Sequence, residues 1–277
     1  MLPEEFIRNA LAEDIGDGDH TSIATVSPTI RGRMQLLAKQ SGIIAGIDIA
    51  QQIIHTHDPD ISIRLQKTDG ERIVPGDIVF FLEGKVRSLL SVERVMLNFM
   101  QRMSGIATYT RSLVDIIDDL PVKLLDTRKT TPGFRIIEKM AVVIGGGHNH
   151  RFGLYDMIMI KDNHVDFAGG IIPALSNVFQ YLDSRQLDLA VEIEVRNLEE
   201  LREVLSFGKI QRIMFDNFSP ELMREAVLLV DGMYETEASG MINERNIRQY
   251  AETGVGFISM GALTHQVRSL DLSLKAI

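Results

Sequence analysis

The sequence predicts an α/β protein in two parts, the second of which is built on a parallel sheet. After Pro121, six strand-like segments alternate with helix-like segments, and nearly every one of these strands ends in polar residues or glycine. The stretch before Pro121 instead contains several short strand-like pieces separated by turns. Alternating strands and helices are typical of a parallel sheet. Polar residues at the ends of all six strands favour a barrel over an open sheet, because an open sheet usually binds at one switch point.

Length and composition limit the class of protein. The 277 residues suit one large barrel or two smaller domains, and the hydrophobic content of 45% is ordinary for a globular protein. The formal charge of −9 argues against a nucleic-acid surface, and the lack of cysteine excludes disulfides and thiol nucleophiles. The acidic start MLPEEFIRNALAED is unlike a secretory signal, and no apolar run is long enough to cross a membrane. We therefore expect a cytoplasmic enzyme that acts on small molecules.

The first part is predicted to be a small unit with much β structure. A helix is expected over residues 3–13, because Glu4 and Glu5 favour its first turn and its apolar residues share a face. A loop rich in Gly and Asp is expected at 14–22, and a second helix at 47–56. From 91 to 119 the spacing of apolar residues is helical, with an interruption expected at Ser104-Gly105. The strand-like pieces cover residues 31–40, 42–46, 61–67 and 77–86.

The second part has a regular order of elements. Asn197 with Glu200, and Ser219 before Pro220, are typical beginnings of helices. Helices are expected near 134–144, 168–182, 198–206, 220–230 and 244–252. Strands are expected at 122–127, 156–161, 190–195, 212–216, 233–239 and 256–261.

Cations gather between residues 126 and 164 of this acidic protein. The segment holds six Lys and Arg residues against four Asp and Glu residues. Arg128-Lys129, Arg151 and Lys161 follow strand ends or a glycine-rich turn, where side chains of this type bind carboxylates or phosphates. This recurring position favours a site for a small anion over unrelated surface ion pairs. Arg135 and Lys139, four residues apart within a helix, are interpreted instead as a solvated face.

Carboxylates and histidines on the inner strands raise the question of a metal. Glu192 and Glu194 alternate onto one face of a strand, and Asp216 ends the next. Such oxygen ligands suit Mg²⁺ that arrives with a phosphorylated substrate, although ion pairs with Lys or Arg explain each acid equally well. His148 and His150 would share a face of a strand, but no third His or Cys ligand is obvious, so zinc is the weaker hypothesis.

Small residues close the last two strands. Ser239-Gly240 and Met260-Gly261-Ala262 leave room for a phosphate on backbone N–H groups, as in many barrels. His265 follows as a candidate phosphate donor. Each of these stretches could equally be a plain tight turn.

Long motifs carry a family resemblance. The stretch LLDTRKTTPGFRIIEKMAVVIGGGHNHRFGLYDMIMIKDNH, followed by VEIEV, MFDNF, EASG and GVGFISMGALTH, resembles the quinolinate phosphoribosyltransferases, also called carboxylating nicotinate-nucleotide pyrophosphorylases. AEDIGDGDHTS and ERVMLNFMQRMSGIAT match the N-terminal half of that family in the same order, so almost the whole chain is covered.

The resemblance implies both a fold and a reaction. It implies an N-terminal α/β sandwich at 1–104 and an open, incomplete α/β barrel of the type II phosphoribosyltransferase kind at 105–277, with the C-terminal tail packing back on the first domain. It further implies transfer of a phosphoribosyl group from phosphoribosyl pyrophosphate to quinolinate with Mg²⁺ and decarboxylation, which yields nicotinate mononucleotide in NAD synthesis.

The resemblance also assigns residues to roles. Lys129, Glu194 and Asp216 would be catalytic, and Glu194 and Asp216 would also meet the metal. Arg94 would enter the site of a partner subunit, in a homodimer or a higher oligomer. Where the family has glycine or asparagine after EASG this chain has Met241, whose side chain is expected to narrow the phosphate loop. The other substrate-binding residues would be Thr127, Arg128, His150, Arg151, Lys161, Ser239, Gly240, Met241, Met260, Gly261, Ala262 and His265.

Two alternative functions remain open. A related phosphoribosyltransferase could use nicotinate or another heterocyclic acid without decarboxylation, but a single carboxylate would need fewer cations than Arg128, Arg151, Lys161 and His150 supply. A non-catalytic anion-binding or carrier protein would bind without turnover, and it leaves Glu194 and Asp216 unexplained.

Overall fold

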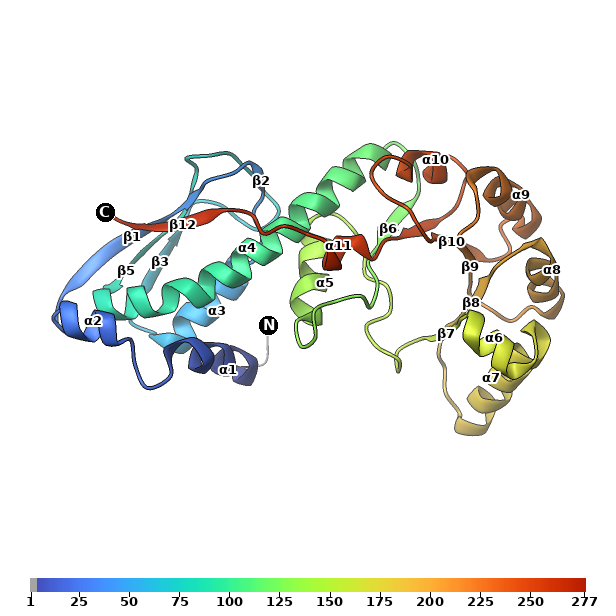
Figure 1. Ribbon diagram of the computed structural model, residues 1–277, viewed down its shortest axis with the longest axis horizontal. Coiled ribbons are helices and arrows are strands. Elements are labelled where there is room, and N and C mark those ends of the chain that lie inside the picture. The colour runs from blue at the N-terminus through green and yellow to red at the C-terminus, as the bar shows by residue number, and fades with distance from the viewer. Residues whose placement is uncertain (1–3) are drawn as a thin grey trace. The chain divides into compact units, whose positions relative to one another are not determined.

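The computed structural model describes residues 4–277 and divides into two compact units. The first unit takes the chain up to Arg111 together with Ile136–Gly146 and Gln266–Ile277, and the second takes Ser112–Arg135 and Gly147–His265. Both units are therefore assembled from separate segments of the chain. Figure 1 shows them with the same colour scale, so that the red C-terminal strand can be followed into the first unit.

The first unit is built on a four-stranded sheet of order β12-β1-β5-β3. The strands β1 (Arg31–Ala38), β3 (Ser62–Leu65), β5 (Ile78–Lys85) and β12 (Leu272–Ala276) pair antiparallel. In β1, Met34, Leu36 and Ala38 are buried while the residues between them are half-buried, as expected for a sheet with one covered face. A two-stranded ribbon of β2 (Gly42–Ile43) and β4 (Arg72–Ile73) accompanies the sheet.

Four helices complete the early part of the chain. They are α1 (Glu4–Ile15), α2 (His20–Thr25), α3 (Ile47–His57) and α4 (Val86–Ile117). The helix and strand predictions for this part are confirmed between Glu4 and Lys85, with Pro3 outside the described residues. The loop predicted at 14–22 is partly wrong, because α2 begins inside it. There Asp19 caps the helix by accepting a hydrogen bond from the backbone N–H of Ser22.

The long helix α4 passes the expected domain boundary at 104/105 without interruption. Ser104 and Gly105 serve close packing rather than a bend. The Ser104 hydroxyl accepts a hydrogen bond from the N–H of Ala45 at 2.9 Å, and a Cβ at Gly105 would lie 2.2 Å from the carbonyl oxygen of Arg268. The interruption of the helix predicted from this Ser-Gly pair is therefore wrong. The first segment of the first compact unit ends at Arg111, within the same helix.

The second unit contains a six-stranded parallel sheet of order β6-β11-β10-β9-β8-β7. The edge strands β6 and β7 are not paired with each other, so the sheet is open, in agreement with the incomplete barrel implied by the resemblance. All six predicted strands form. They are β6 (Lys123–Leu125), β7 (Ile158–Ile160), β8 (Val191–Val195), β9 (Arg212–Asp216), β10 (Glu235–Ser239) and β11 (Phe257–Ser259).

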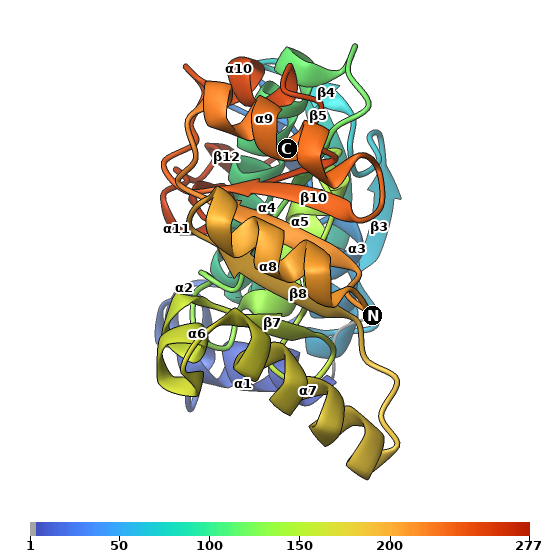
Figure 2. The ribbon, with the colours of Figure 1, turned by 90° about the vertical axis from the view of Figure 1, so that its right-hand side faces the viewer.

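Helices cover the outer side of this curved row of strands, as Figures 1 and 2 show for α8 and α9. The predicted beginnings of two helices are confirmed. The Asn197 side chain accepts hydrogen bonds from two backbone N–H groups, and Ser219 caps the helix that starts at Pro220. The short helix α6 was not predicted. The helices after β6 are α5 (Arg135–Ile144), α6 (Asp162–Ala168), α7 (Ile171–Arg185), α8 (Leu198–Phe207), α9 (Pro220–Val230), α10 (Ile247–Ala251) and α11 (Ala262–His265).

None of the helices within residues 4–277 is both long and apolar enough to cross a bilayer.

Candidate active site

Two loops that carry predicted cations are joined at the end of β6. Leu125 forms an isolated parallel bridge with His148, and the buried carboxylate of Asp126 accepts a hydrogen bond from the N–H of His150 at 2.8 Å. The chain from Thr127 to Lys129 therefore starts beside His150 and Arg151, although more than twenty residues separate the two loops.

Arg128 and Arg151 form a concentration of positive charge. Burial, followed by repulsion from Arg128, lowers the pKa of Arg151. The Nε of Arg128 is buried and makes no hydrogen bond within residues 4–277, whereas Arg151 donates to the carbonyl oxygen of Met157 at 3.1 Å. Two neighbouring guanidinium groups, one with an unused buried donor, favour the binding of an anion.

Acidic and basic groups meet at the ends of β7, β8 and β9. Lys161 Nζ lies 3.4 Å from Glu194 Oε2, and the Glu194 side chain is buried. Burial raises the pKa of Glu194, Lys161 opposes this effect, and repulsion from Asp216 adds to it. Glu194 and Asp216 therefore place like charges at the ends of neighbouring strands, where a cation would reduce their repulsion.

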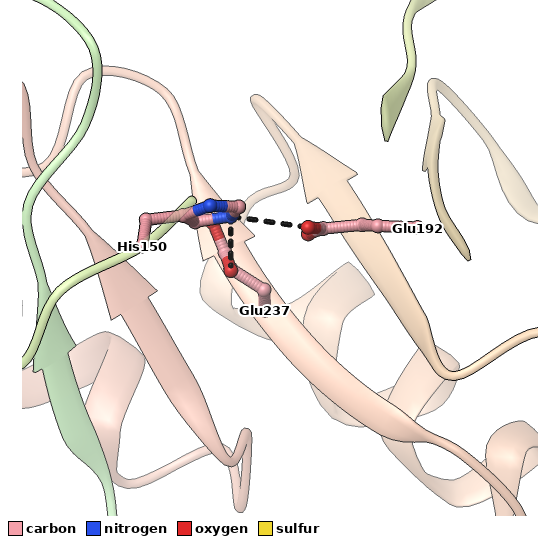
Figure 3. A group of neighbouring side chains, drawn as sticks. All are labelled: His150, Glu192 and Glu237. Carbon is pink, nitrogen blue, oxygen red and sulfur yellow. Dashed lines mark ion pairs between the residues drawn. The ribbon is translucent and has the colours of Figure 1, made fainter. Parts of the chain in front are cut away.

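His150 lies in a buried cluster with Glu192 and Glu237 (Figure 3). Its Nε2 lies 3.0 Å from Glu192 and 3.3 Å from Glu237. Burial lowers the pKa of His150, but the two carboxylates outweigh this effect and raise the pKa to about 9. Its Nδ1 accepts the N–H of Arg151 at 2.6 Å, and this contact opposes the protonation of Nδ1 that the two carboxylates favour. In either protonation state, Nε2 carries a proton that faces the glutamates.

Arg212 supplies a second positive charge to this cluster. Its Nη1 donates to Glu237 at 3.0 Å and its Nη2 donates to Glu235 at 2.8 Å, while its guanidinium lies over the ring of Phe257. Burial and repulsion from Glu237 raise the pKa of Glu192. His150 and Arg212 outweigh burial at Glu237 and hold its pKa low.

The cluster has the ligand types of a metal site, with one atom from each of His150, Glu192 and Glu237 within 4.8 Å of the others. Arg212 argues against a metal, because it pairs with one of the three and would be repelled by a divalent ion. We interpret the cluster as a buried ion-pair network. The ion-pair alternative for Glu192 is thereby favoured.

Glycines bring the remaining predicted residues together. A Cβ at Gly261 would lie 2.7 Å from Lys129 Cδ and 3.2 Å from the His265 ring, so both side chains lie against this glycine. Gly240 has φ +93° and a Cβ there would lie 2.2 Å from Asn217 Oδ1. Asn217 in turn donates to Asp216 at 2.8 Å. Ser239 ends β10 and Met260 to Ala262 follow β11, so these residues lie at the same edge of the sheet as Glu194.

Met241 combines high exposure with an unusual backbone conformation. Its side chain is 87% exposed and its φ of +51° lies in the left-handed region that favours glycine or asparagine. Its carbonyl oxygen accepts hydrogen bonds from the side chains of Asn243 and Asn246. That Met241 narrows the phosphate loop stays a prediction. Its backbone conformation is one that glycine or asparagine adopts more readily.

We expect Met241→Asn to stabilise the protein by about 1 kcal/mol, because asparagine adopts a left-handed conformation more readily than methionine. Urea unfolding would measure the change. Met233→Asn is the matched control, since Met233 is also exposed but is not among the residues with positive φ. Equal effects of the two substitutions would show that the loss of an exposed methionine, and not the backbone, is responsible.

The interpretation of Arg135 and Lys139 as a solvated face is wrong. Lys139 is 2% exposed, and its neighbour Glu138 is buried in an ion pair with Arg102 at 2.7 Å. Arg135 is half-buried and donates to Thr130 Oγ1 and to the carbonyl oxygen of Phe152. The spacing of residues within one helix or strand shows which of them share a face, but not which residues elsewhere in the chain they contact. The role of Arg135 was therefore misinterpreted, and Arg212 and Glu237 were not recognised as partners of site residues.

Arg94 belongs to a different compact unit from the other predicted site residues. It is an exposed residue of α4 and belongs to the first unit, whereas the other predicted site residues all belong to the second.

An open parallel α/β sheet with neighbouring arginines and paired carboxylates at its strand ends defines an enzyme site for anionic substrates. Comparisons with known proteins narrow this class. Residues 19–104 match the family description "Quinolinate phosphoribosyl transferase, N-terminal domain", and residues 106–275 match "Quinolinate phosphoribosyl transferase, C-terminal domain". The chain belongs to the quinolinate phosphoribosyltransferase family.

Individual relatives match nearly the whole of this chain. "Quinolinate phosphoribosyltransferase [decarboxylating] 1" of Nicotiana glauca is 44% identical over 97% of this chain and 81% of its own length. "Probable nicotinate-nucleotide pyrophosphorylase [carboxylating]" of Bacillus subtilis is 42% identical over 98% of this chain and 92% of its own. The solved structure of NadC from Streptococcus pyogenes has a TM-score of 0.93 at 37% identity, and the match covers 99% of this chain and 96% of that one.

Proposed function

We propose that this protein transfers the 5-phosphoribosyl group from phosphoribosyl pyrophosphate to the nitrogen of quinolinate with decarboxylation. The products are nicotinate mononucleotide, pyrophosphate and CO₂, as in de novo NAD biosynthesis. Family membership and the names of the relatives support this reaction. Among the features of the site, Arg128 and Arg151 carry the proposal, because they lie on two loops joined at the end of β6 and a dicarboxylate is a ligand that matches two guanidinium groups.

In this proposal the two carboxylates of quinolinate are held by Arg128, Arg151 and Lys161. The buried free donor of Arg128 supports its part. The sequence also assigns His150 to this task. Both ring nitrogens of His150 face protein groups, so its contribution is proposed to pass through the backbone of Arg151, whose N–H it accepts.

Glu194 and Asp216 are proposed to stabilise the positive charge that develops on the ribose as pyrophosphate leaves. Both are carboxylates at the ends of neighbouring strands, and their mutual repulsion fits a pair that receives a cation. Mg²⁺ brought by phosphoribosyl pyrophosphate would be held there and would neutralise phosphate charge. Lys129, whose side chain lies against Gly261, is proposed to serve both substrates near the reacting centre.

Backbone N–H groups at the last strands are proposed to seat the phosphate. The tight packing at Gly240 and Gly261 supports this assignment, because neither position has room for a larger residue. The residues concerned are Ser239, Gly240, Met241, Met260, Gly261, Ala262 and His265. After ribosylation the cationic pyridinium nitrogen stabilises the electron pair that departing CO₂ leaves on the adjacent ring carbon, and a proton then adds to this carbon to give nicotinate mononucleotide. This step requires positioning and control of access by water.

The active unit is proposed to be a homodimer in which Arg94 of one subunit reaches the partner's site, and the location is proposed to be cytoplasmic. The exposure of Arg94 on α4 is compatible with such a contact. We expect Arg94→Ala and Lys129→Ala each to be inactive alone, whereas mixed dimers regain activity because one of the two sites keeps both residues. Activity measured after subunit exchange would test this. Confirmed mixed dimers without activity would exclude a shared site.

The deciding experiment is incubation with quinolinate, phosphoribosyl pyrophosphate and Mg²⁺ while CO₂ and nicotinate mononucleotide are measured together. Equal amounts of both products, and none without Mg²⁺, are expected. Ribosylation of nicotinate without use of quinolinate would favour the non-decarboxylating alternative. Binding of quinolinate or nicotinate without formation of any product would favour the alternative of a non-catalytic anion-binding protein.

A further inference from the structure

Arg135 joins the two loops that carry Arg128 and Arg151. Its Nε donates to Thr130 Oγ1 at 3.0 Å, its Nη1 to the carbonyl oxygen of Phe152 at 2.9 Å, and its Nη2 lies 3.5 Å from the carbonyl oxygen of Arg128. One side chain therefore contacts both loops, next to the two residues proposed to bind quinolinate.

The first loop is a turn that Arg135 closes. The N–H of Thr130 donates to the carbonyl oxygen of Arg128 at 2.9 Å, and Arg135 approaches the same oxygen. Thr130 and Arg135 thus hold the backbone of Arg128 in place. The Nε of the Arg128 side chain makes no hydrogen bond within residues 4–277. A guanidinium whose backbone is held by its surroundings loses less entropy when it binds a ligand.

The second loop is held together by its own contacts. Asp156 accepts the N–H groups of Phe152 and Gly153 at 2.6 and 2.8 Å, and Arg151 donates to Met157 at 3.1 Å. Such a loop can shift as one body relative to the first. Asp126 joins the two loops at their base through the N–H of His150, and Arg135 joins them two residues further along the second loop.

We propose that Arg135 is a positioning residue that fixes the separation of Arg128 and Arg151 for the two carboxylates of quinolinate. The inference rests on the proposed function. It concerns geometry rather than charge, because the planar guanidinium spans acceptors on both loops at once and a lysine ammonium cannot. Arg135 itself is not proposed to touch the substrate.

The neighbouring Lys129 is held by a different contact. The Thr264 hydroxyl donates to the carbonyl oxygen of Lys129 at 2.7 Å, and its side chain lies against Gly261. Loss of Arg135 is therefore expected to affect quinolinate, which Arg128 and Arg151 bind, more than phosphoribosyl pyrophosphate.

The test compares Arg135→Gln and Arg135→Lys with wild type. Quinolinate affinity is measured by calorimetry and the KM for each substrate by initial rates. In Arg135→Gln, quinolinate affinity is expected to fall about 10-fold or more, because the two guanidinium groups are no longer held at the separation that both carboxylates require. The KM for phosphoribosyl pyrophosphate is expected to stay unchanged. Arg135→Lys is expected to recover only part of the affinity.

Arg248→Gln is the matched control. Arg248 lies in the same unit and also makes several bonds, to Ile116 O at 3.1 Å, to Asp119 at 2.9 Å and to Glu252 at 2.7 Å, but it contacts none of the proposed substrate residues. Both glutamine variants are expected to lose some thermal stability. Arg135→Gln alone is expected to lose quinolinate affinity.

Three results would overturn the inference. They are unchanged quinolinate affinity in Arg135→Gln, an equal loss in Arg248→Gln, and full recovery in Arg135→Lys, which would make charge alone sufficient. Arg128→Ala separates this failure from that of the proposed function. If Arg128→Ala abolishes quinolinate binding while Arg135→Gln preserves it, only the positioning role fails. If neither substitution affects binding, the proposed quinolinate site fails.

Discussion

Replacing Arg128 by alanine is expected to weaken quinolinate binding roughly 30-fold or more, which corresponds to the cost of about 2–5 kcal/mol for truncating one side of a buried charge pair. The reason is the position of the guanidinium. It lies beside Arg151, and its Nε is buried without a hydrogen bond in the described part of the chain. A bound carboxylate would accept a hydrogen bond from this Nε. Calorimetric titration with quinolinate measures the change.

The fold of this variant should survive, because Arg128 is not a member of the buried ion-pair network. Arg128→Lys is the matched control, since it keeps the charge but cannot form two parallel hydrogen bonds with one carboxylate. We expect an intermediate affinity for it. An unchanged affinity in Arg128→Ala would remove this residue from the site.

Replacing Arg212 by methionine is expected to destabilise the protein by about 3–5 kcal/mol, because it leaves a buried carboxylate without one of its cations. Glu237 would keep His150, but Glu192 competes for the same ring. The stacking of Arg212 on Phe257 makes methionine a suitable replacement in shape. Denaturant unfolding, followed by circular dichroism, measures the loss.

Two further variants make this prediction specific. Arg196→Met is the control for an exposed arginine, which pairs with Asp166 and Glu200 at the surface and should cost at most about 1 kcal/mol. In the double variant Arg212→Met/Glu237→Gln one negative charge is also removed, so we expect part of the stability to return. If the double variant is no more stable than Arg212→Met, charge imbalance is not the cause.

Local patterns were sufficient to predict much of the fold. The six strands of the second unit were found from alternation and from their polar ends, and Asn197 and Ser219 were recognised as caps because capping depends on a few neighbouring residues. The helix α2 was missed because Asp19, its cap, lies in a run of Gly and Asp that resembles a loop.

The features that could not be predicted from the sequence are ion pairs between residues far apart in the chain. Glu138 and Lys139 are buried on a helix whose residue pattern resembled a solvated face. Arg102, the partner of Glu138, lies on another helix that is distant in the sequence. The network of His150, Glu192, Arg212 and Glu237 depends on the register of neighbouring strands, in which Glu192 lies opposite Arg212. No pattern within one strand fixes that register.

The C-terminal strand has a consequence for how the chain folds during synthesis. Strand β12 pairs with β1 over five positions, from Met34 opposite Ala276 to Ala38 opposite Leu272, so the first sheet gains this edge strand only after the chain of the second unit has been made. Contacts between such distant parts of a chain slow folding, because a long loop must close before they form. Until β12 pairs with it, one side of β1 has no neighbouring strand and can pair with other chains.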